Sequence, residues 1–369
     1  MRAGSPAQRV AAVAALALFV GSAHADARPS PPMIGVNKAE EHGTIGLRGA
    51  AAMGARYDRV PIMQTDPFPV PSAQPYPWQA LDDIFRDESA AGVRVLPLLL
   101  PKYQGFSASQ TSAFVQWADW FMRRYGAGGG FWTEYPDLKR ALAPTVFEVY
   151  NEVYGPWSEP SAPYDAAGYD DLFKQVATAG RGINPGFRFL FSATDFAQTA
   201  DGQPVGKWAD MVVNADSTIG GYIDGLAVHP YYFKTETNAT GYDSTGYDRV
   251  TRQTKQFFAD KGIDKPVYIT EVGLCTSPQP LIADNWLPCG TVANQTAAID
   301  YWFADFRNTP WIYALLVYQY QDCVPDQPCP SATSLYVSNK EAWFGLVDRW
   351  GVPKPGYAEF KNQARQTTS

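Results

Sequence analysis

Two short apolar segments of this chain each end in a glutamate. Val149-Tyr150-Asn151 leads into Glu152, and Tyr268-Ile269-Thr270 leads into Glu271. The two glutamates are 119 residues apart (271 − 152), which is three times a strand–helix unit of about 40 residues. Two carboxylates held face to face can supply an acid/base and a nucleophile, the pair that hydrolyses glycosidic bonds.

Eight apolar or β-branched segments along the chain are typical of buried strands. They show little alternation of polar and apolar residues, which favours parallel strands covered on both faces. The segments are Met33–Val36, Tyr57–Met63, Val93–Leu100, Thr145–Tyr150, Phe187–Phe191, Ile223–Val228, Val267–Thr270 and Ile312–Tyr318.

Segments of helical periodicity lie between these strands. The clearest is Ser109–Tyr125, followed by Gly126 where a helix C-cap belongs. Alternating strands and helices indicate an α/β protein with a parallel sheet. Eight of each predict a (β/α)8 TIM barrel over residues 33–369, a single domain with elaborated βα loops. The alternative is an open doubly wound sheet, but no glycine-rich phosphate loop follows an early strand.

In such a barrel, residues at the carboxyl ends of the strands face the active site. Three units separate strand 4 from strand 7, so Glu152 and Glu271 should face each other across the mouth.

Asp195, after strand 5, is expected to cap the following helix, and residues 40–42 are expected to lie on a solvated first loop. Other polar or aromatic residues that follow the strands are Asn37, Asn151, His229, Tyr231, Tyr232 and Tyr318.

The first 25 residues are typical of an export signal. Arg2 and Arg9 precede the apolar stretch Val10–Val20, and Ala23-His24-Ala25 offers a cleavage site. We expect a signal peptide over residues 1–25, a linker over 26–32 and a secreted protein, extracellular or periplasmic. An N-terminal membrane anchor is the alternative, although the apolar stretch is short for a bilayer span.

The four cysteines lie in the C-terminal third of the chain. An even, clustered set in an exported protein suggests two disulfides. The local pairing Cys275–Cys289 and Cys323–Cys329 is our first choice among the three that four cysteines allow.

Composition argues against several other classes. The net charge of −7, with no basic run, disfavours nucleic acid or an anionic membrane as a partner. A histidine–cysteine zinc centre is disfavoured, because there is no CxxC motif and only His42 and His229 follow the signal. We expect neither a metal nor a cofactor.

Three motifs resemble glycoside hydrolase clan A, the retaining (β/α)8 glycosidases that include families 5 and 39. They are Phe147-Glu148-Val149-Tyr150-Asn151-Glu152, Ala227-Val228-His229-Pro230-Tyr231 and Tyr268-Ile269-Thr270-Glu271-Val272-Gly273, at strands 4, 6 and 7. Arg59 resembles the strand 2 arginine of that clan. The resemblance extends over most of the mature chain and depends on the order and spacing of the motifs.

The resemblance implies a different catalytic role for each of the two glutamates. Glu152 would be the general acid/base and Glu271 the nucleophile, with their carboxyl groups about 5–5.5 Å apart. Their environments would have to keep Glu152 protonated and Glu271 ionised at the start of the cycle.

The same resemblance implies that four residues near the glutamates contact either Glu271 or the sugar in the subsite where cleavage occurs. Arg59 would hold Glu271 anionic, and Tyr231 would donate a hydrogen bond to it. Asn151 would contact the sugar 2-hydroxyl, and His229 would add a further hydrogen bond. Arg59 neutralising a buried carboxylate and His229 as a core histidine are alternatives.

The sugar platform departs from the clan pattern. Many members have a tryptophan at the end of strand 8, where this chain has Tyr318; Tyr318 would serve, or Trp343 would fold back. For Asn37, the sequence leaves two roles possible: a contact in the active site or a purely structural one. Four tryptophans on predicted loops would add platforms or simply pack: Trp78, Trp132, Trp157 and Trp286.

We therefore expect a secreted, retaining glycoside hydrolase that cleaves β-glycosidic bonds in a poly- or oligosaccharide by double displacement. The carbohydrate is its only expected partner, and a monomer its expected state. A transglycosylase using the same site and a non-catalytic carbohydrate-binding barrel are the alternatives.

Overall fold

The computed structural model describes residues 32–64, 78–102, 105–155, 165–199, 202–231, 237–238, 241–277, 289–323 and 340–368. The predicted signal peptide (1–25) and the linker up to residue 31 lie outside these residues. So do Trp157, Trp286 and Cys329. The expectations placed on them therefore stay predictions.

Eight parallel strands close into a barrel in the order β1-β10-β9-β6-β5-β4-β3-β2. Pairing of β1 with β10, from Met33 beside Ala314 to Val36 beside Val317, completes the ring. This confirms the predicted (β/α)8 fold, and each expected strand is found with ends within two residues. The strands are β1 Met33–Asn37, β2 Tyr57–Met63, β3 Arg94–Leu100, β4 Val146–Val149, β5 Arg188–Ser192, β6 Gly225–Val228, β9 Val267–Val272 and β10 Ile312–Val317.

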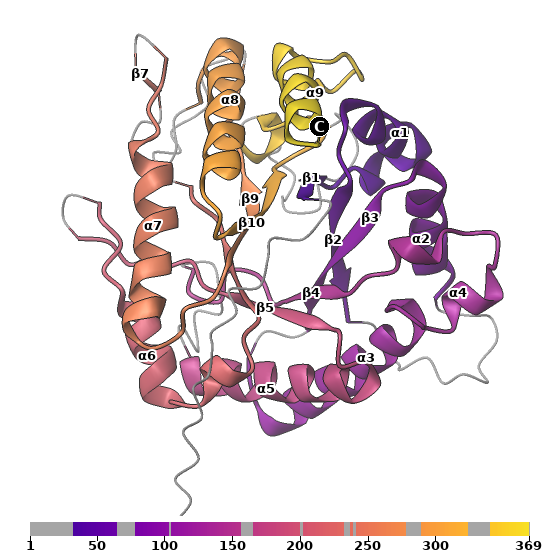
Figure 1. Ribbon diagram of the computed structural model, residues 1–369, viewed down its shortest axis with the longest axis vertical. Helices are drawn as coiled ribbons and strands as arrows, with labels where there is room; N and C mark the ends of the chain where they lie inside the picture. The colour runs from indigo at the N-terminus through magenta and orange to yellow at the C-terminus, as the bar shows by residue number, and fades with distance from the viewer. Residues whose placement is uncertain are drawn as a thin grey trace, which may run out of the picture.

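Helices surround this barrel, as Figure 1 shows. The last helix packs against α8 and α1, so the end of the chain lies beside its first βα unit. Among the described residues, no helix combines the length and apolarity that crossing a bilayer requires. The helices are α1 Gly43–Met53, α2 Gln79–Ala91, α3 Ala108–Tyr125, α4 Phe131–Glu134, α5 Ala166–Ile183, α6 Lys207–Ala215, α7 Thr245–Asp260, α8 Val292–Asn308 and α9 Pro355–Thr368.

Shorter elements connect these parts. The first βα connection contains the 3-10 helix η1, Glu40–His42. Others are η2 Arg140–Leu142, η3 Ile219–Gly221, η5 Lys340–Trp343 and the antiparallel pair β7 Thr237–Asn238 and β8 Gly241–Tyr242.

Local sequence explains why α3 forms where it was expected. Ser107 and Gln110 form a capping box at its start, which satisfies backbone N–H groups of the first turn. Phe114, Trp117 and Phe121 form a fully buried stripe along one face. Gly126 does end the helix, but in an extended rather than left-handed conformation.

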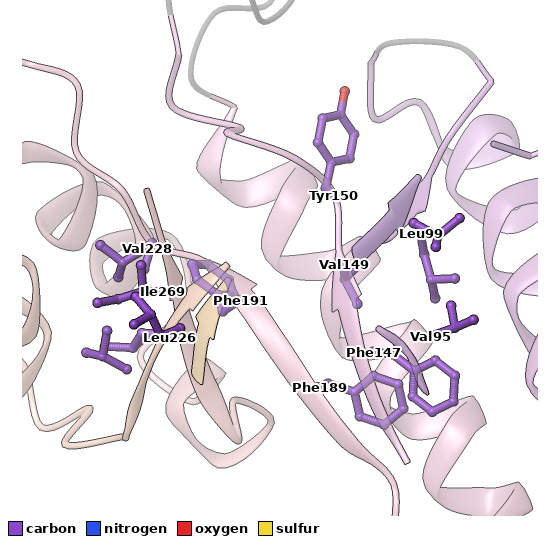
Figure 2. Packing of buried hydrophobic residues seen from close by; sticks show 14 of the residues in the cluster. Val95, Leu99, Phe147, Val149, Tyr150, Phe189, Phe191, Leu226, Val228 and Ile269 are labelled. Atoms are coloured by element: carbon purple, nitrogen blue, oxygen red, sulfur yellow. The ribbon is translucent and has the colours of Figure 1, made fainter. Parts of the chain in front are cut away.

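Side chains alternate between the two faces of the barrel wall. On β4 and β5, Phe147, Val149, Phe189 and Phe191 point outward and pack under the helices (Figure 2). Burying each such side chain contributes about 1.5–3 kcal/mol. The inward positions form a separate apolar layer that closes the barrel below the mouth: Met33, Tyr57, Leu96, Leu190, Ala227, Tyr268, Tyr313, Ala314 and Leu316.

Two tryptophans considered as sugar platforms belong to the core instead. Trp78 is buried at the start of α2, where its ring stacks on Trp120 with centroids 5.4 Å apart. Trp132 is buried in α4, and its Nε1 donates to the Tyr125 carbonyl at 2.8 Å. The packing alternative is therefore correct for both.

Candidate active site

The backbone turns sharply where β4 ends. Glu148 points into the barrel and Val149 points outward, as strand alternation requires. Tyr150 and Glu152 then adopt positive φ angles of 68° and 46°. Such left-handed conformations are uncommon for residues with a side chain and cluster at functional sites. The turn brings both Asn151 and Glu152 to the mouth.

In β9, a β-bulge directs the side chains towards the barrel mouth. Pairing with β10 shifts register between Ile269, opposite Leu315, and Val272, opposite Val317, so β9 holds one extra residue here. Simple alternation would send Thr270 inward and Glu271 outward. The extra residue lets both side chains face the barrel interior, and bulges commonly re-aim side chains in this way.

The guanidinium of Arg59, from β2, joins the two strand ends. Its Nε and Nη2 donate to both oxygens of Glu148, at 2.6 and 2.9 Å, and its Nη1 donates to Glu271 Oε1 at 2.5 Å. Both interpretations of Arg59 therefore hold, because it neutralises a buried carboxylate and also contacts Glu271. The bidentate contact with Glu148 fixes the plane of the guanidinium.

Two asparagines complete the cage around this guanidinium. Asn37 Oδ1 accepts from Arg59 Nη1 at 3.2 Å, while Asn37 Nδ2 donates to the Thr270 carbonyl at 3.1 Å. Asn151 Oδ1 accepts from Arg59 Nη2 at 2.7 Å. Asn37 thus has a positioning contact, and Asn151 presents its amide nitrogen as the remaining donor.

His229, from the end of β6, lies between the two glutamates. Its Nδ1 is 2.6 Å from Glu152 Oε1 and 3.8 Å from Glu271 Oε2. Its Nε2 is 3.0 Å from Thr270 Oγ1, which in turn donates to Glu148 Oε1 at 3.2 Å. Both ring nitrogens therefore face acceptors, an arrangement that favours the doubly protonated imidazolium.

These contacts set the protonation of the cluster. Burial alone would raise the pKa of Glu148, but the Arg59 charge and the contacts with His229 lower it to about 2. Burial would lower the pKa of His229, but the charges of Glu271 and Glu152 raise it to about 10. Burial raises the pKa of Glu152, and the nearby Glu271 charge adds to this.

A charge count is consistent with these directions. Arg59 and His229 carry two positive charges and face three carboxyl groups. Neutrality inside a low-dielectric site then leaves one carboxyl protonated. Glu152, whose pKa is raised by burial and by the Glu271 charge, is the candidate for that proton.

Exposure separates the groups that can touch a ligand from those that support them. The side chains of Glu152 and Glu271 remain 11% and 13% exposed, whereas those of Arg59, Glu148 and His229 are 3% exposed or less. A carboxylate oxygen of Glu152 lies within 4.8 Å of one of Glu271. Two accessible carboxyl groups thus face one small space.

Glu152, His229 and Glu271 also have the atom types of a metal site, with one ligand atom from each within 4.8 Å of the others. Here, however, Arg59 already forms an ion pair with Glu271, and His229 Nδ1 already lies 2.6 Å from Glu152 Oε1. A metal ion would have to displace these contacts.

An aromatic wall stands beside Glu271. Tyr231 Oη donates to Glu271 Oε2 at 3.5 Å. Tyr231 and Tyr318 each pack edge-on against Phe344, with centroids 6.0 and 5.7 Å apart, and Trp343 belongs to the same buried cluster. Both candidates for the sugar platform, Tyr318 and Trp343, are therefore in this wall.

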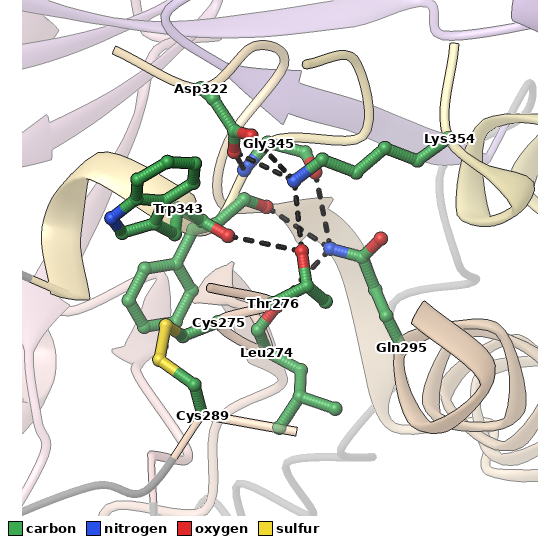
Figure 3. Close-up of a disulfide and its surroundings, with 10 residues drawn as sticks. Leu274, Cys275, Thr276, Cys289, Gln295, Asp322, Trp343, Gly345 and Lys354 are labelled. Carbon is green, nitrogen blue, oxygen red and sulfur yellow. Dashed lines mark hydrogen bonds and ion pairs between the residues drawn. A yellow bond between two sulfur atoms is a disulfide. The ribbon is translucent and has the colours of Figure 1, made fainter. Parts of the chain in front are cut away.

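A disulfide and a polar network hold the loops behind that wall (Figure 3). Cys275 and Cys289 are bonded as predicted, 14 residues apart in sequence. The second expected pair includes Cys329, which lies outside the described residues. Gly273 permits the close approach of the ends of β9 and β10, because a Cβ there would lie 2.1 Å from the Tyr318 carbonyl oxygen.

The polar part of this network centres on Lys354. Its Nζ donates to Thr276 Oγ1 at 2.8 Å and lies 2.7 Å from Asp322 Oδ2. Gln295 Nε2 donates to the carbonyls of Leu274 and Gly345 at 3.1 and 3.2 Å (Figure 3). Segments following β9 and β10 are thus tied to the α8 and C-terminal regions.

Other residues considered from the sequence have structural contacts. Asp195 Oδ2 accepts from the Trp208 N–H at 3.2 Å in the first turn of α6, as a capping residue does. Glu148 and Thr270 had no predicted role. A signal for Glu148 exists, since it is the single charged residue in the apolar strand β4, and a buried charge must have a partner.

The comparisons with known proteins concern the fold. No protein-family model matches the sequence, and no curated protein does. Among solved structures, a family 39 glycoside hydrolase from the gut symbiont Bacteroides cellulosilyticus aligns with a TM-score of 0.58 at 15% identity, covering 91% of this chain and 64% of that one. This chain has the fold of glycoside hydrolases.

Two further structures agree. A monomeric β-xylosidase from Caulobacter crescentus aligns with a TM-score of 0.57 at 15% identity, covering 91% of this chain and 68% of that one. A GH5_18 protein from Bifidobacterium longum subsp. infantis aligns with 0.56 at 15%, covering 91% and 79%. The resemblance to families 39 and 5 is thus confirmed for the barrel, while this chain spans less than two thirds of the Bacteroides enzyme.

Proposed function

We propose that the protein is a retaining glycoside hydrolase in which Glu152 is the general acid/base and Glu271 the nucleophile. The observation that carries the proposal is the pair of accessible carboxyl groups, with oxygens within 4.8 Å, in unlike charge environments. Retaining enzymes hold their two carboxyl groups about 5–5.5 Å apart, and inverting enzymes about 6.5–9.5 Å.

In the first step, Glu152 transfers its proton to the glycosidic oxygen as the bond to the leaving group breaks. Glu271 attacks the anomeric carbon and forms a glycosyl ester. The Arg59 contact places a positive charge beside the Glu271 carboxylate and fixes its orientation before attack. As that charge is consumed, Arg59 retains Glu148 as a counter-ion.

In the second step, Glu152 is a carboxylate and accepts a proton from water. The resulting hydroxide attacks the anomeric carbon and releases Glu271. The His229 Nδ1–H donates to Glu152 throughout, so it steadies the anionic form that this half of the cycle needs. The Asn151 amide would donate to the sugar 2-hydroxyl, and the Tyr231 wall would flank the ring.

We also propose a β-linked poly- or oligosaccharide substrate and export from the cell. Names of structural neighbours, a β-xylosidase and an endo-β-1,4-mannanase, suggest xylosides and mannans as first substrates. The Cys275–Cys289 bond is compatible with an oxidising compartment. N-terminal sequencing of the exported protein, beginning at Asp26, tests the cleavage site.

The test is reducing-sugar release from β-linked polysaccharides and aryl β-glycosides by wild type, Glu271→Gln and the control Glu359→Gln, which removes a carboxylate from α9. Wild type and control should turn over a common substrate, and Glu271→Gln should lose about 10⁴-fold or more in kcat. Unchanged activity in Glu271→Gln would refute the nucleophile assignment. Glycan binding without turnover would support the non-catalytic barrel instead.

A further inference from the structure

Three carboxyl groups meet on the outer side of β2, away from the barrel mouth. Asp58 follows strand alternation and points to the side opposite its neighbour Arg59. Glu40 reaches it from η1 and Glu88 from α2, the helix that lies outside β2 and β3 in Figure 1. One oxygen from each of the three lies within 4.8 Å of the others.

These carboxyl oxygens are buried but poorly satisfied. Asp58 and Glu88 are 0% and 1% exposed, and Glu40 is half-buried. Within the described part of the chain, no donor reaches either oxygen of Glu88, Asp58 Oδ1 or Glu40 Oε2. The Glu40 N–H donates to Asp58 Oδ2 at 2.9 Å, and the Ala39 backbone also hydrogen-bonds Asp58. Four buried oxygens thus lack a donor among the described residues, and one oxygen from each side chain lies within 4.8 Å of the others, which is costly unless protons or a ligand join them.

No cation from the described part of the chain neutralises the cluster. Lys38, the nearest lysine in sequence to Glu40, contacts Glu41 at 3.8 Å, and Arg59 contacts Glu148 and Glu271 inside the barrel. Burial and mutual repulsion raise the pKa of Glu40, Asp58 and Glu88 well above their usual range. The cluster therefore needs positive charge from solution, as protons or as a metal ion.

We propose that Glu40, Asp58 and Glu88 bind a divalent metal ion, with Ca²⁺ the best match. The donors are all oxygens, which suit Ca²⁺ and Mg²⁺ rather than metals that prefer nitrogen or sulfur. Glu88 can bind through both oxygens, a mode that Ca²⁺ accepts within its flexible shell of 6–8 ligands, whereas Mg²⁺ demands a near-ideal octahedron. Water would complete the shell.

The bound ion would brace the strand ends that support the barrel mouth. It would join η1, which follows Asn37 closely, to β2, which carries Arg59, and both to α2. Its effect would be structural, on the rigidity of this side of the barrel. The proposal does not depend on the glycosidase assignment.

The test uses protein dialysed against EDTA, with Ca²⁺, Mg²⁺ and Mn²⁺ added separately at pH 7.5 and followed by calorimetry and thermal unfolding. Wild type should bind one Ca²⁺ and unfold at a higher temperature as Ca²⁺ increases. Glu88→Gln and Glu40→Gln should each weaken Ca²⁺ binding by at least about tenfold. Asp83→Asn, which removes an exposed carboxylate from the same helix, should bind like wild type.

Two results would overturn the proposal. One is the absence of binding by all three cations to wild type, accompanied by an unfolding temperature that falls as pH rises, which would show that the carboxyl groups share protons instead. The other is binding that persists in both variants, which would place the ion elsewhere. If Glu88→Gln does not fold, the half-buried Glu40→Gln decides.

Discussion

Consecutive residues of β2, Asp58 and Arg59, enter two carboxyl clusters of opposite design. Inside the barrel, three carboxyl groups face Arg59 and His229, and each of the three has at least one hydrogen bond or ion pair of 2.5–2.6 Å with one of these two side chains. Outside it, Asp58 meets two more carboxyl groups and no cation among the described residues. The inner cluster carries its own counter-charge, whereas the outer one depends on the solution.

This difference explains what each cluster can do. Fixed positive charge inside the barrel lowers the pKa of Glu148, while burial and the Glu271 charge raise the pKa of Glu152, so these two carboxyl groups of the inner set differ in their affinity for a proton. The outer set has no fixed partner, and its charge follows pH and metal concentration. Catalysis needs the first arrangement, and a reversible structural ion site needs the second.

The largest expected difference between the two clusters is in kcat, when the proposed acid/base Glu152 is replaced. Glu152→Gln should lower kcat about 10²–10⁴-fold on natural glycosides, because the leaving oxygen is no longer protonated. With an activated aryl leaving group the first step needs less acid help, so the loss should be smaller. Glu88→Gln, assayed with Ca²⁺ under the same conditions, should stay close to wild type. Equal losses in the two variants would remove the functional distinction.

Removing the positive charge of Arg59 should show how much this charge contributes to the free energy of unfolding. Arg59→Met leaves Glu148 and Glu271 without their cation and should destabilise the fold by about 3–5 kcal/mol, measured by urea unfolding at pH 7. Asp58→Asn removes a charge from the uncompensated outer cluster and should be neutral or stabilising in EDTA. A comparable destabilisation by Asp58→Asn would mean that this carboxylate has a favourable charge partner after all.

The two clusters should also respond to pH with opposite signs. Glu148 has its pKa lowered to about 2, so its contribution is present above about 4.5 and is lost as pH falls towards 2. The difference in unfolding free energy between wild type and Glu148→Gln should therefore shrink on acidification, by up to about 3 kcal/mol. A difference that does not change with pH would contradict the lowered pKa.

The outer carboxyl groups have raised pKa values, so without metal their contribution is present at low pH and lost as pH rises. In EDTA, wild type should lose stability relative to Glu88→Gln as the pH rises above the ordinary carboxyl pKa of about 4.3, and Ca²⁺ should suppress this loss. Parallel pH curves for the two proteins would show that Glu88 does not titrate abnormally.

Sequence patterns predicted the elements well because strand and helix periodicities are local. Each strand was located to within two residues, and the spacing of Glu152 and Glu271 placed them on strands that face across the mouth. Orientation was harder to predict. Alternation alone would turn Glu271 outward, and it faces inward because of a bulge that depends on pairing with β10.

Contacts between elements that are distant in sequence were also not predicted. Glu40 was expected on a solvated loop but is half-buried, because η1 folds back against Asp58. The partnership of Glu88 with Asp58 depends on how α2 is rotated against β2, which no single segment encodes. The buried position of Glu88 on α2, three residues after the core residue Phe85, was the available signal.

The most direct test of the retaining pair is the anomeric configuration of the first sugar released, followed by proton NMR on a substrate that wild type turns over. The distance between Glu152 and Glu271 predicts that the β configuration is kept initially and then mutarotates. Initial release of the α anomer would contradict the account, since it would mean direct attack by water and no bond to Glu271.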